Sequence, residues 1–444
     1  MYSQKIRKIL LSKKIKTGDR VLVESGGEKY EGMLMPSTDF SDPDNVIIKL
    51  DSGYNIGVRA ASVSRLKTGK PVEFRHASIH NGKSSKPPVS ILGCGGTIAS
   101  RVEYSTGAVF PSFSPADLVA SFPEINDVAR ISGRKLFDLL SEDMNPSHWQ
   151  VIAKEAAKEI GSGASGVVLM HGTDTMHYTS AALSFMLQGL PVPVILVGAQ
   201  RSSDRGSSDN AMNLISAVLS AASSDIAEVM VCMHANMDDD YCILHQGTKV
   251  RKLHTSRRDA FRSINVPPFA KVNYEQKSIE YLRKDYRRRE KRKLLLDTKV
   301  NPNVALVHSH PGMNPKFIES LGKNYDGVVI AGTGLGHVPT NPFRDKLAVS
   351  IIPALEGLIK SGVPVVMAPQ TIYGRLNLNV YTAGRMLNEI GVIGDGCDWT
   401  PECALAKLMF VLGHTKDMKK VSEMMLTNIS GEVSERSRVG TFLV

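Results

Sequence analysis

The chain has 444 residues, of which 42% are apolar, 22% charged and 6% aromatic, and its formal net charge is +10 at pH 7. This length calls for several hydrophobic cores, and the composition excludes an intrinsically disordered chain. No run approaches the ~18 apolar residues that cross a bilayer, and the N-terminus lacks the apolar segment of a signal peptide. We therefore expect a soluble, cytoplasmic globular protein with no membrane partner.

The positive charge favours polyanionic partners. It is concentrated in residues 283–293, "RKDYRRREKRK", where eight basic residues stand against two acidic ones. Two interpretations of this segment stay open: a solvated linker and a nucleic-acid contact. The five cysteines show no C-x-x-C spacing, which argues against a disulfide framework and against a thiolate zinc site.

The first part of the chain, residues 1–85, alternates short apolar runs with turn sequences, as in "DRVLVES" followed by two glycines. About five short strands at hairpin spacing predict a small β-barrel of the SH3-like or Sm-like kind. The polar, proline-bearing segment 81–88 is typical of a linker. Because the barrel lacks obvious stacking aromatic residues, we favour docking or subunit positioning over RNA binding as its role.

The second part, residues 86–285, alternates buried strands such as "GVVLM" and "VPVILVG" with helical patterns at 114–122 and 148–163. This alternation predicts a doubly wound α/β sheet, here called the N-lobe. After a linker at 286–300 the alternation resumes, so residues 301–444 predict a smaller α/β C-lobe. The expected fold class is therefore α/β, with two α/β lobes preceded by a small β-barrel.

Two threonines follow predicted buried strands: Thr97 in "GCGGTIAS" and Thr173 in "MHGTDTMHYTS". In an open parallel sheet the ligand crevice lies beyond the carboxyl ends of the strands, so both hydroxyls are expected to face it. A threonine hydroxyl is a weak nucleophile unless a neighbour accepts its proton, and Asp174 with a lysine elsewhere could form such a relay. The glycine pattern fits neither a P-loop nor a dinucleotide fingerprint. The residues alone leave amidohydrolase and phosphate-binding chemistry open.

Six segments resemble the bacterial-type asparaginases and follow that family's order along the chain. They are "GCGGTIAS", "EYSTGAV", "SEDMNPSHW", "LMHGTDTMHYTSAALSF", "KLHTSRRDAF" and "YDGVVIAGTGLGHVP". The resemblance implies an asparaginase-like core and an amidohydrolase mechanism. In that mechanism a threonine is acylated by the side-chain acyl group of asparagine or glutamine, ammonia leaves, and water hydrolyses the ester.

Carried over residue by residue, the resemblance implies that Thr97 is the primary nucleophile and that Tyr104 lies on a loop that polarises it. Thr173, Asp174 and Lys252 correspond to the second catalytic triad of the family. A lysine accepts a proton only in its neutral form, which a neighbouring carboxylate disfavours. We therefore expect Asp174 and Lys252 to act as a coupled pair that shares a proton. Which threonine attacks first stays open.

The resemblance also implies a substrate-binding set. Ser141 and Glu142 correspond to the residues that hold the α-carboxylate and α-amino group of the substrate. Gly96 and Gly172 complete this set, and backbone N–H groups near Gly96, Thr97 and Thr173 are placed to donate to the developing oxyanion.

The chain departs from the asparaginase pattern at two places. Cys94 replaces the usual small hydroxyl residue of the first glycine motif, which is expected to change packing more than chemistry. Leu335 or His337 stands where many homotetrameric asparaginases carry an asparagine that completes a neighbouring active site.

With the barrel and "RKLHTSRRDAFRS" included, almost the whole chain resembles the D subunits of archaeal-type Glu-tRNA(Gln) amidotransferases. That resemblance implies a subunit that releases ammonia from L-glutamine or L-asparagine. A partner, the E subunit of the amidotransferase, would use ATP and Mg²⁺ to activate Glu-tRNA(Gln) and would receive the ammonia, giving Gln-tRNA(Gln). No cofactor or metal is expected on this chain itself, and a homodimer within a heterotetramer is implied.

Two other functions are considered for this sequence. A free-standing L-asparaginase with an accessory barrel is the main alternative. A catalytically silent scaffold for tRNA or partner binding is disfavoured by the intact threonine, aspartate and lysine positions. His308 and His310 could suggest a metal but lack further ligands, and Asp238 to Asp240 fit a turn better than a cation site.

Overall fold

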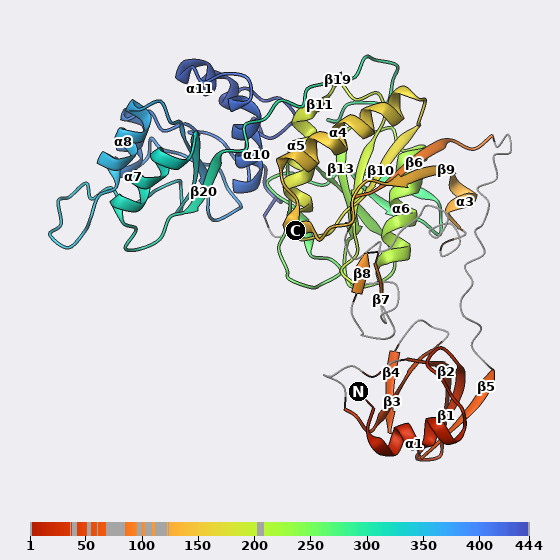
Figure 1. The fold of residues 1–444 in the computed structure, drawn as a ribbon. Coiled ribbons are helices and arrows are strands. Elements are labelled where there is room, and N and C mark those ends of the chain that lie inside the picture. Colours follow the sequence, from red (N-terminus) through yellow and green to blue (C-terminus); the bar gives the residue numbers. More distant parts are fainter. Residues whose placement is uncertain are drawn as a thin grey trace.

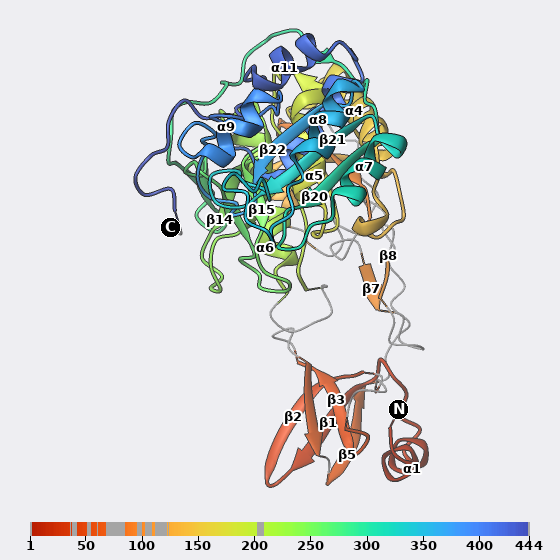
Figure 2. The same cartoon turned by 90° about the vertical axis from the view of Figure 1, so that its left-hand side faces the viewer.

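The protein forms a small β-barrel and two α/β lobes (Figure 1). The computed structural model describes residues 2–35, 37, 42–50, 55–59, 61–67, 85–95, 100–102, 109–111, 122, 124–201 and 208–442. The helix predicted at 114–122 lies outside these ranges except for its last residue, and so do residues 81–84 of the predicted linker. Figures 1 and 2 both show the barrel apart from the two lobes.

The barrel is a five-stranded antiparallel sheet in the order β4-β3-β2-β1-β5. Its strands are β1 (Arg20–Ser25), β2 (Glu28–Leu34), β3 (Asn45–Lys49), β4 (Asn55–Arg59) and β5 (Ser62–Lys67). Helix α1 (Gln4–Ser12) starts at the capping side chain of Ser3 and buries Ile6 and Leu10, one turn apart, against the sheet. The strands that alternation predicts thus form one small, separate core.

The N-lobe is built on an eight-stranded sheet in the order β18-β17-β14-β13-β12-β10-β6-β9. Strands β6 (Pro88–Gly93), β9 (Arg130–Lys135), β10 (Gly166–Met170), β12 (Val194–Val197) and β13 (Val229–His234) pair in parallel. Strands β14 (Cys242–Gln246), β17 (Ala270–Asn273) and β18 (Ser278–Tyr281) add an antiparallel edge. The expected α/β sheet is present, and this edge is an addition that the sequence did not indicate.

Helices cover both faces of this sheet. Helices α4 (Pro146–Gly161) and α5 (Met176–Met186) pack with Val167 and Leu169 in one core. Helices α3 (Ile125–Val128) and α6 (Asn210–Ser223) pack with Val168 and Met170 in the other. Because successive residues of β10 enter opposite cores, both faces of the strand are buried, as its continuous apolar run predicts.

The C-lobe is a three-stranded parallel sheet in the order β20-β21-β22 with helices around it. Its elements are β20 (Val304–His308), α7 (Pro315–Asn324), β21 (Gly327–Gly332), α8 (Ile352–Lys360), β22 (Val365–Pro369), α9 (Thr382–Glu389), α10 (Pro401–Leu412) and α11 (Met418–Leu426). Helix α10 lies beside α5 (Figure 1), and the Phe185 and Phe410 rings stack with centroids 6.1 Å apart. The two lobes therefore share one hydrophobic core.

Several short elements complete the chain between the main strands and helices. A hairpin of β15 (Val250–Lys252) and β16 (Phe261–Ser263) follows β14, and a 3-10 turn, η2, spans Ser141–Asp143. Two more short pairs join β7 (Ser100–Val102) to β8 (Val109–Pro111) and β11 (Leu187–Gln188) to β19 (Leu295–Leu296). The C-terminal segment also returns to the N-lobe, where the Gln246 side chain donates to the Gly431 carbonyl at 2.9 Å.

The basic segment 283–293 is tied to the N-lobe by its arginines. Each of its five arginines donates to, or forms an ion pair with, a group of this chain. Arg287 pairs with Glu228 and Arg288 with Asp225. These contacts tie the arginines to the fold, so the segment is not a freely solvated linker.

Arg289→Ala is expected to lower the free energy of unfolding by about 2–4 kcal/mol. Its guanidinium donates to the carbonyls of Ser224 at 2.9 Å, Ser165 at 2.6 Å and Ala221 at 2.9 Å, and so joins the end of α6 to the start of β10. Urea unfolding measures the loss. The control Lys291→Ala changes an exposed side chain and should stay within about 0.5 kcal/mol of the parent. Equal losses in Arg289→Ala and Lys291→Ala would contradict the stabilising role of the Arg289 hydrogen bonds.

Candidate active site

The segment after β10 carries the first part of the site. His171, Gly172 and Thr173 leave the carboxyl end of a central strand and lead into α5, whose first residue is Met176. Thr173 is buried, whereas the side chain of Asp174 is 65% exposed. The strand end therefore presents a shielded hydroxyl with a water-facing carboxylate next to it.

The β15–β16 hairpin brings a lysine to this hydroxyl. Lys252, the last residue of β15, donates from Nζ to Thr173 Oγ1 at 2.9 Å and to Asp174 Oδ1 at 2.7 Å. The lysine side chain is 9% exposed, so its ammonium is largely shielded while its partner carboxylate is not. The structure thus brings together three of the predicted catalytic residues, although 78 residues separate Lys252 from Asp174.

The turn η2 packs against the same strand end and carries Ser141 and Glu142. A Cβ atom on Gly172 would lie 2.6 Å from Ser141 Cβ, so this position requires glycine. Thr175 Oγ1 donates to the Ser141 carbonyl at 2.6 Å, a contact that sequence reasoning missed. Ser141 is buried and Glu142 exposed, so the turn is fixed beside the hydroxyl with its carboxylate facing outwards.

The first glycine motif approaches this turn from β6. Gly95 has a φ of +92°, and a Cβ there would overlap the Leu139 carbonyl oxygen, so a side chain is excluded. Cys94, which departs from the asparaginase pattern, is buried, and burial raises the pKa of its thiol to about 12. Gly96, Thr97 and Tyr104 lie outside the described residues.

A buried polar network lies beneath Thr173. His171 Nε2 is 2.9 Å from Thr179 Oγ1, its Nδ1 is 2.7 Å from the Gly172 carbonyl oxygen, and Trp149 Nε1 donates to Thr179 Oγ1 at 3.0 Å. Burial lowers the pKa of His171 to about 4, so the imidazole is neutral at pH 7. These contacts give His171 and Trp149 a packing role under the site.

Other polar side chains of interest do not form a metal site. His308 and His310 are exposed, and His310 Nδ1 contacts the Pro311 carbonyl oxygen at 2.9 Å. Asp239, in the bend between β13 and β14, forms an ion pair with Arg258, which lies between β15 and β16. Within the described ranges no group of three or more His, Cys, Asp or Glu side chains is arranged to hold a metal ion. The described part of the chain likewise contains no helix long and apolar enough to cross a membrane.

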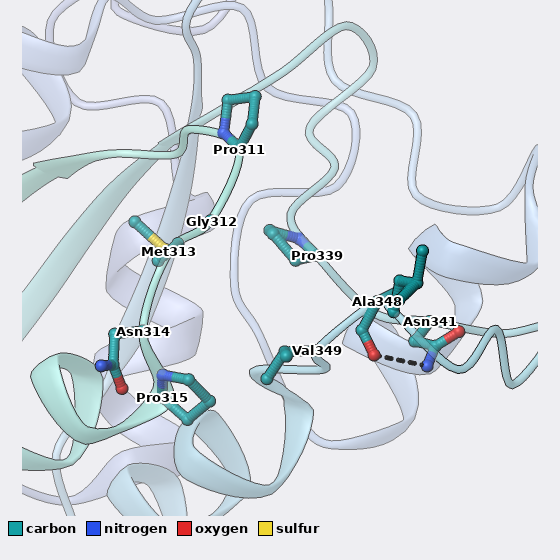
Figure 3. Close-up of a pocket in the computed structure, with 10 residues that line it drawn as sticks. Pro311, Gly312, Met313, Asn314, Pro315, Pro339, Asn341, Ala348 and Val349 are labelled. Carbon is teal, nitrogen blue, oxygen red and sulfur yellow. Dashed lines mark hydrogen bonds between the residues drawn. The ribbon is translucent and has the colours of Figure 1, made fainter.

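The C-lobe has a cavity of about 490 Å³ beyond the carboxyl end of β20 (Figure 3). Pro311, Met313, Pro339 and Val349 form much of its wall, and none of its lining side chains is ionisable. This cavity offers no acid or base, so the catalytic candidate is the Thr173, Asp174 and Lys252 cluster. Leu335 and His337 follow β21 in the same lobe, and His337 packs edge-on against Tyr381.

Three family profiles match the chain, and together they cover most of it. "Asparaginase, N-terminal" matches residues 88–287, "Glutaminase/Asparaginase C-terminal domain" matches residues 303–425, and "GatD N-terminal domain" matches residues 15–67.

Relatives and solved structures agree with these profiles. The D subunit of the glutamyl-tRNA(Gln) amidotransferase of Pyrococcus horikoshii is 50% identical over 99% of this chain and 100% of its own. The protein of the same name from Methanothermobacter thermautotrophicus is 46% identical over 99% of both chains. The solved L-asparaginase of Thermococcus kodakarensis is 32% identical, with a TM-score of 0.69, and its whole chain covers 79% of this one.

Acidification is expected to destabilise the fold through buried histidines. Burial lowers the pKa of His171 to about 4 and those of His177 and His245 to about 3. The unfolded chain, with its histidines near the ordinary value of about 6.5, therefore binds protons first as the pH falls. The contribution of these neutral imidazoles to the free energy of unfolding is fully present above about pH 6.5. Each imidazole should lower that free energy by about 2 kcal/mol between pH 7 and pH 5.

Urea unfolding at pH 7 and pH 5 measures this effect. His171→Asn should reduce the difference between the two pH values by about 2 kcal/mol, because one buried imidazole is removed. His308→Asn, which changes an exposed histidine, should leave the difference as in the parent. A pH-independent stability in the parent protein would contradict the prediction.

Proposed function

The chain belongs to the D-subunit family of the glutamyl-tRNA(Gln) amidotransferases, and from this premise we propose that it is the amidohydrolase subunit of a tRNA-dependent amidotransferase. It releases ammonia from L-glutamine or L-asparagine for the amidation of Glu-tRNA(Gln) by a partner. One observation carries the proposal: the Lys252 ammonium bridges the Thr173 hydroxyl at 2.9 Å and the Asp174 carboxylate at 2.7 Å. A hydroxyl linked to a lysine and a carboxylate is suited to acyl transfer.

In the proposed reaction Thr97 Oγ forms a bond to the carboxamide carbon of the substrate. The threonine proton passes to the leaving nitrogen, the C–N bond breaks, and ammonia departs from a threonyl ester. Water then hydrolyses the ester, which releases glutamate or aspartate and returns the hydroxyl to the threonine. Tyr104 assists the first threonine, while Thr173 and Lys252 move the proton.

Asp174 and Lys252 act as one unit in this scheme. The Asp174 carboxylate holds the Lys252 ammonium beside the Thr173 hydroxyl. A proton that Lys252 gives to Thr173 can return from Thr173 to Lys252 later in the cycle. Because the Asp174 side chain is 65% exposed, water screens the pair, and its free energy is small. The role of Asp174 is therefore orientation of the lysine more than stabilisation of the fold.

The substrate-binding residues are proposed from their place around this cluster. Ser141 and Glu142 receive the α-carboxylate and α-amino group, since η2 packs against Gly172 beside Thr173. Backbone N–H groups near Gly96 and Gly172 stabilise the oxyanion, and each such donor contributes roughly 3 kcal/mol to the transition state.

The ammonia-receiving partner is proposed to be the E subunit of the amidotransferase, which binds ATP and Mg²⁺ and holds Glu-tRNA(Gln). Support comes from the relatives, which are named as subunits of an amidotransferase. The chain is proposed to act as a homodimer within a heterotetramer, and its net charge of +10 suits an assembly that contains RNA.

A free-standing L-asparaginase is the second candidate. The observation in its favour is that a complete L-asparaginase from Vibrio cholerae, 28% identical with a TM-score of 0.67, covers 79% of this chain. Against it stand the N-terminal region, which matches the "GatD N-terminal domain", and the nearly full-length relatives.

Lys252→Met is expected to lower the rate of ammonia release from L-glutamine roughly 10²- to 10⁴-fold, because the proton relay loses its amine. The assay couples ammonia to a dehydrogenase, and urea unfolding checks that the variant is folded. Lys316→Met, a change of an exposed lysine in α7, is the matched control and should keep the parent rate. Parent-like turnover in Lys252→Met would rule the lysine out of the chemistry.

Addition of the E subunit and Glu-tRNA(Gln) is expected to raise ammonia release by the full chain on the order of tenfold, because binding at the partner is coupled to this site. Ammonium salt should restore tRNA amidation by an assembly that contains Lys252→Met, since only the ammonia supply is lost. Fast turnover by the chain alone that neither addition changes would favour the free-standing asparaginase.

A further inference from the structure

The base of the hairpin that carries Lys252 is fixed by residues of the C-lobe. Lys249 directly precedes β15, and Asn265 follows β16 by two residues, so the two flank the hairpin on opposite arms. The Ile264 N–H donates to the Lys249 carbonyl at 2.7 Å and closes the base. Lys252 lies three residues from Lys249, or about 10 Å along an extended strand.

Asp398 holds both arms at once. Lys249 Nζ donates to Asp398 Oδ1 at 2.7 Å and to its carbonyl oxygen at 3.1 Å, and Asn265 Nδ2 donates to the same carbonyl at 2.9 Å. The side chains of Lys249 and Asp398 are 0% and 1% exposed. Asp398 lies in the C-lobe, two residues before Thr400, which caps α10. One C-lobe residue thus contacts both arms of the N-lobe hairpin, Lys249 through its carboxylate and carbonyl and Asn265 through its carbonyl.

Two further contacts point the same way. Arg251, next to Lys252, pairs with Glu402 in the first turn of α10 at 2.8 Å. Asn265 has a φ of +62°, a left-handed conformation that costs energy for a residue with a side chain. Its side chain accepts from the Gly374 N–H at 2.9 Å, which holds that conformation from the C-lobe side. C-lobe residues therefore contact the hairpin at three positions, 249 and 251 on one arm and 265 at the end of the other.

Stability alone is a poor explanation for these pairs. Two charges removed from water lose about as much hydration free energy as they gain by pairing. Among the described residues, Glu402 Oε2 is buried without a hydrogen-bond partner, which adds to the cost. Asp398 Oδ2 accepts no hydrogen bond there either, and it lies 3.7 Å from Arg375 Nη2, a third charge at this pair. The Lys249–Asp398 and Arg251–Glu402 pairs are better explained by the hairpin that they orient.

We propose that Asp398, acting through Lys249 and Asn265, is a positioning residue that aims Lys252 at Thr173 and Asp174. The packing of the C-lobe against the N-lobe then sets the geometry of the reactive lysine. The catalytic meaning of this orientation rests on the proposed function, whereas the orientation itself can be measured without turnover.

The test variant is Lys249→Met with Asp398→Leu in the full chain, which removes both charges and retains apolar volume. The matched control is Lys407→Met with Glu432→Met. That pair is equally buried, at 0% exposure for both side chains, and its atoms lie 2.5 Å apart. It joins α10 to the C-terminal segment, and among the described residues it forms no hydrogen bond or ion pair with hairpin residues 249–265.

The first readout is the reactivity of Lys252, measured by competitive acetylation of the full chain and mass spectrometry of the Lys252 peptide. A Lys252 amine that is no longer held between Thr173 and Asp174 is more accessible to the reagent, so its acetylation rate should rise about fivefold in the test variant and stay at the parent value in the control. This measurement needs neither substrate nor partner.

The second readout is ammonia release by the complete assembly. The test variant should lose kcat on the order of 10²-fold while KM stays within about twofold, because a misplacement of about 1 Å penalises the reacting geometry more than binding. The control should keep kcat per folded molecule. Parent-like kcat and Lys252 reactivity in the test variant would overturn the proposal, and so would equal losses in both double variants.

Asp398→Asn covers the case in which the double variant does not fold. It keeps the backbone carbonyl contact but loses the charge, so an intermediate effect is expected, with kcat about tenfold lower and Lys252 more reactive. Parent values in Asp398→Asn would overturn the proposal. If the parent assembly released no ammonia, the proposed function would fail, and the acetylation rates would still decide whether Asp398 positions Lys252.

Discussion

The site depends on one ammonium group shared between a hydroxyl and a carboxylate. Lys252 reaches Thr173 at 2.9 Å and Asp174 at 2.7 Å from a different part of the chain. With the carboxylate in water, such a pair contributes little free energy by itself. It cannot hold the two chain segments together, so the surrounding fold has to bring them to hydrogen-bonding distance. The packing of β10 and the hairpin is therefore a condition of the chemistry.

On the side of Thr173, close packing of backbone segments brings the hydroxyl into position. Both faces of β10 are buried, which leaves Thr173 little freedom to move. Gly95 and Gly172 let the chain at Leu139 and Ser141 come closer than any side chain would permit. On the lysine side the hairpin buries Val250, Ala260 and Phe261 in the hydrophobic core, and polar contacts from the C-lobe add to this packing.

Local patterns in the sequence were sufficient for the elements that carry Thr173. The apolar run of β10 and the helical pattern at 148–163, which α4 largely covers, are local signals, and the motif likeness pointed to Thr173 and Lys252 as partners. Contacts between distant segments carry no such signal. The arginines at 287 and 288 fit an RNA contact equally well in sequence, because Glu228 and Asp225 lie some sixty residues away. The antiparallel edge and the Lys249–Asp398 pair escaped prediction for the same reason.

The arrangement of the cores decides which parts of the molecule can influence the lysine. Helices α5 and α10 place both lobes in one hydrophobic core, and the N-terminal end of α10 bears Glu402, close to Asp398. A change in lobe packing therefore reaches the hairpin through rigid, buried contacts. The barrel has a core of its own within residues 2–63. Among the described residues it shares no apolar cluster with the lobes.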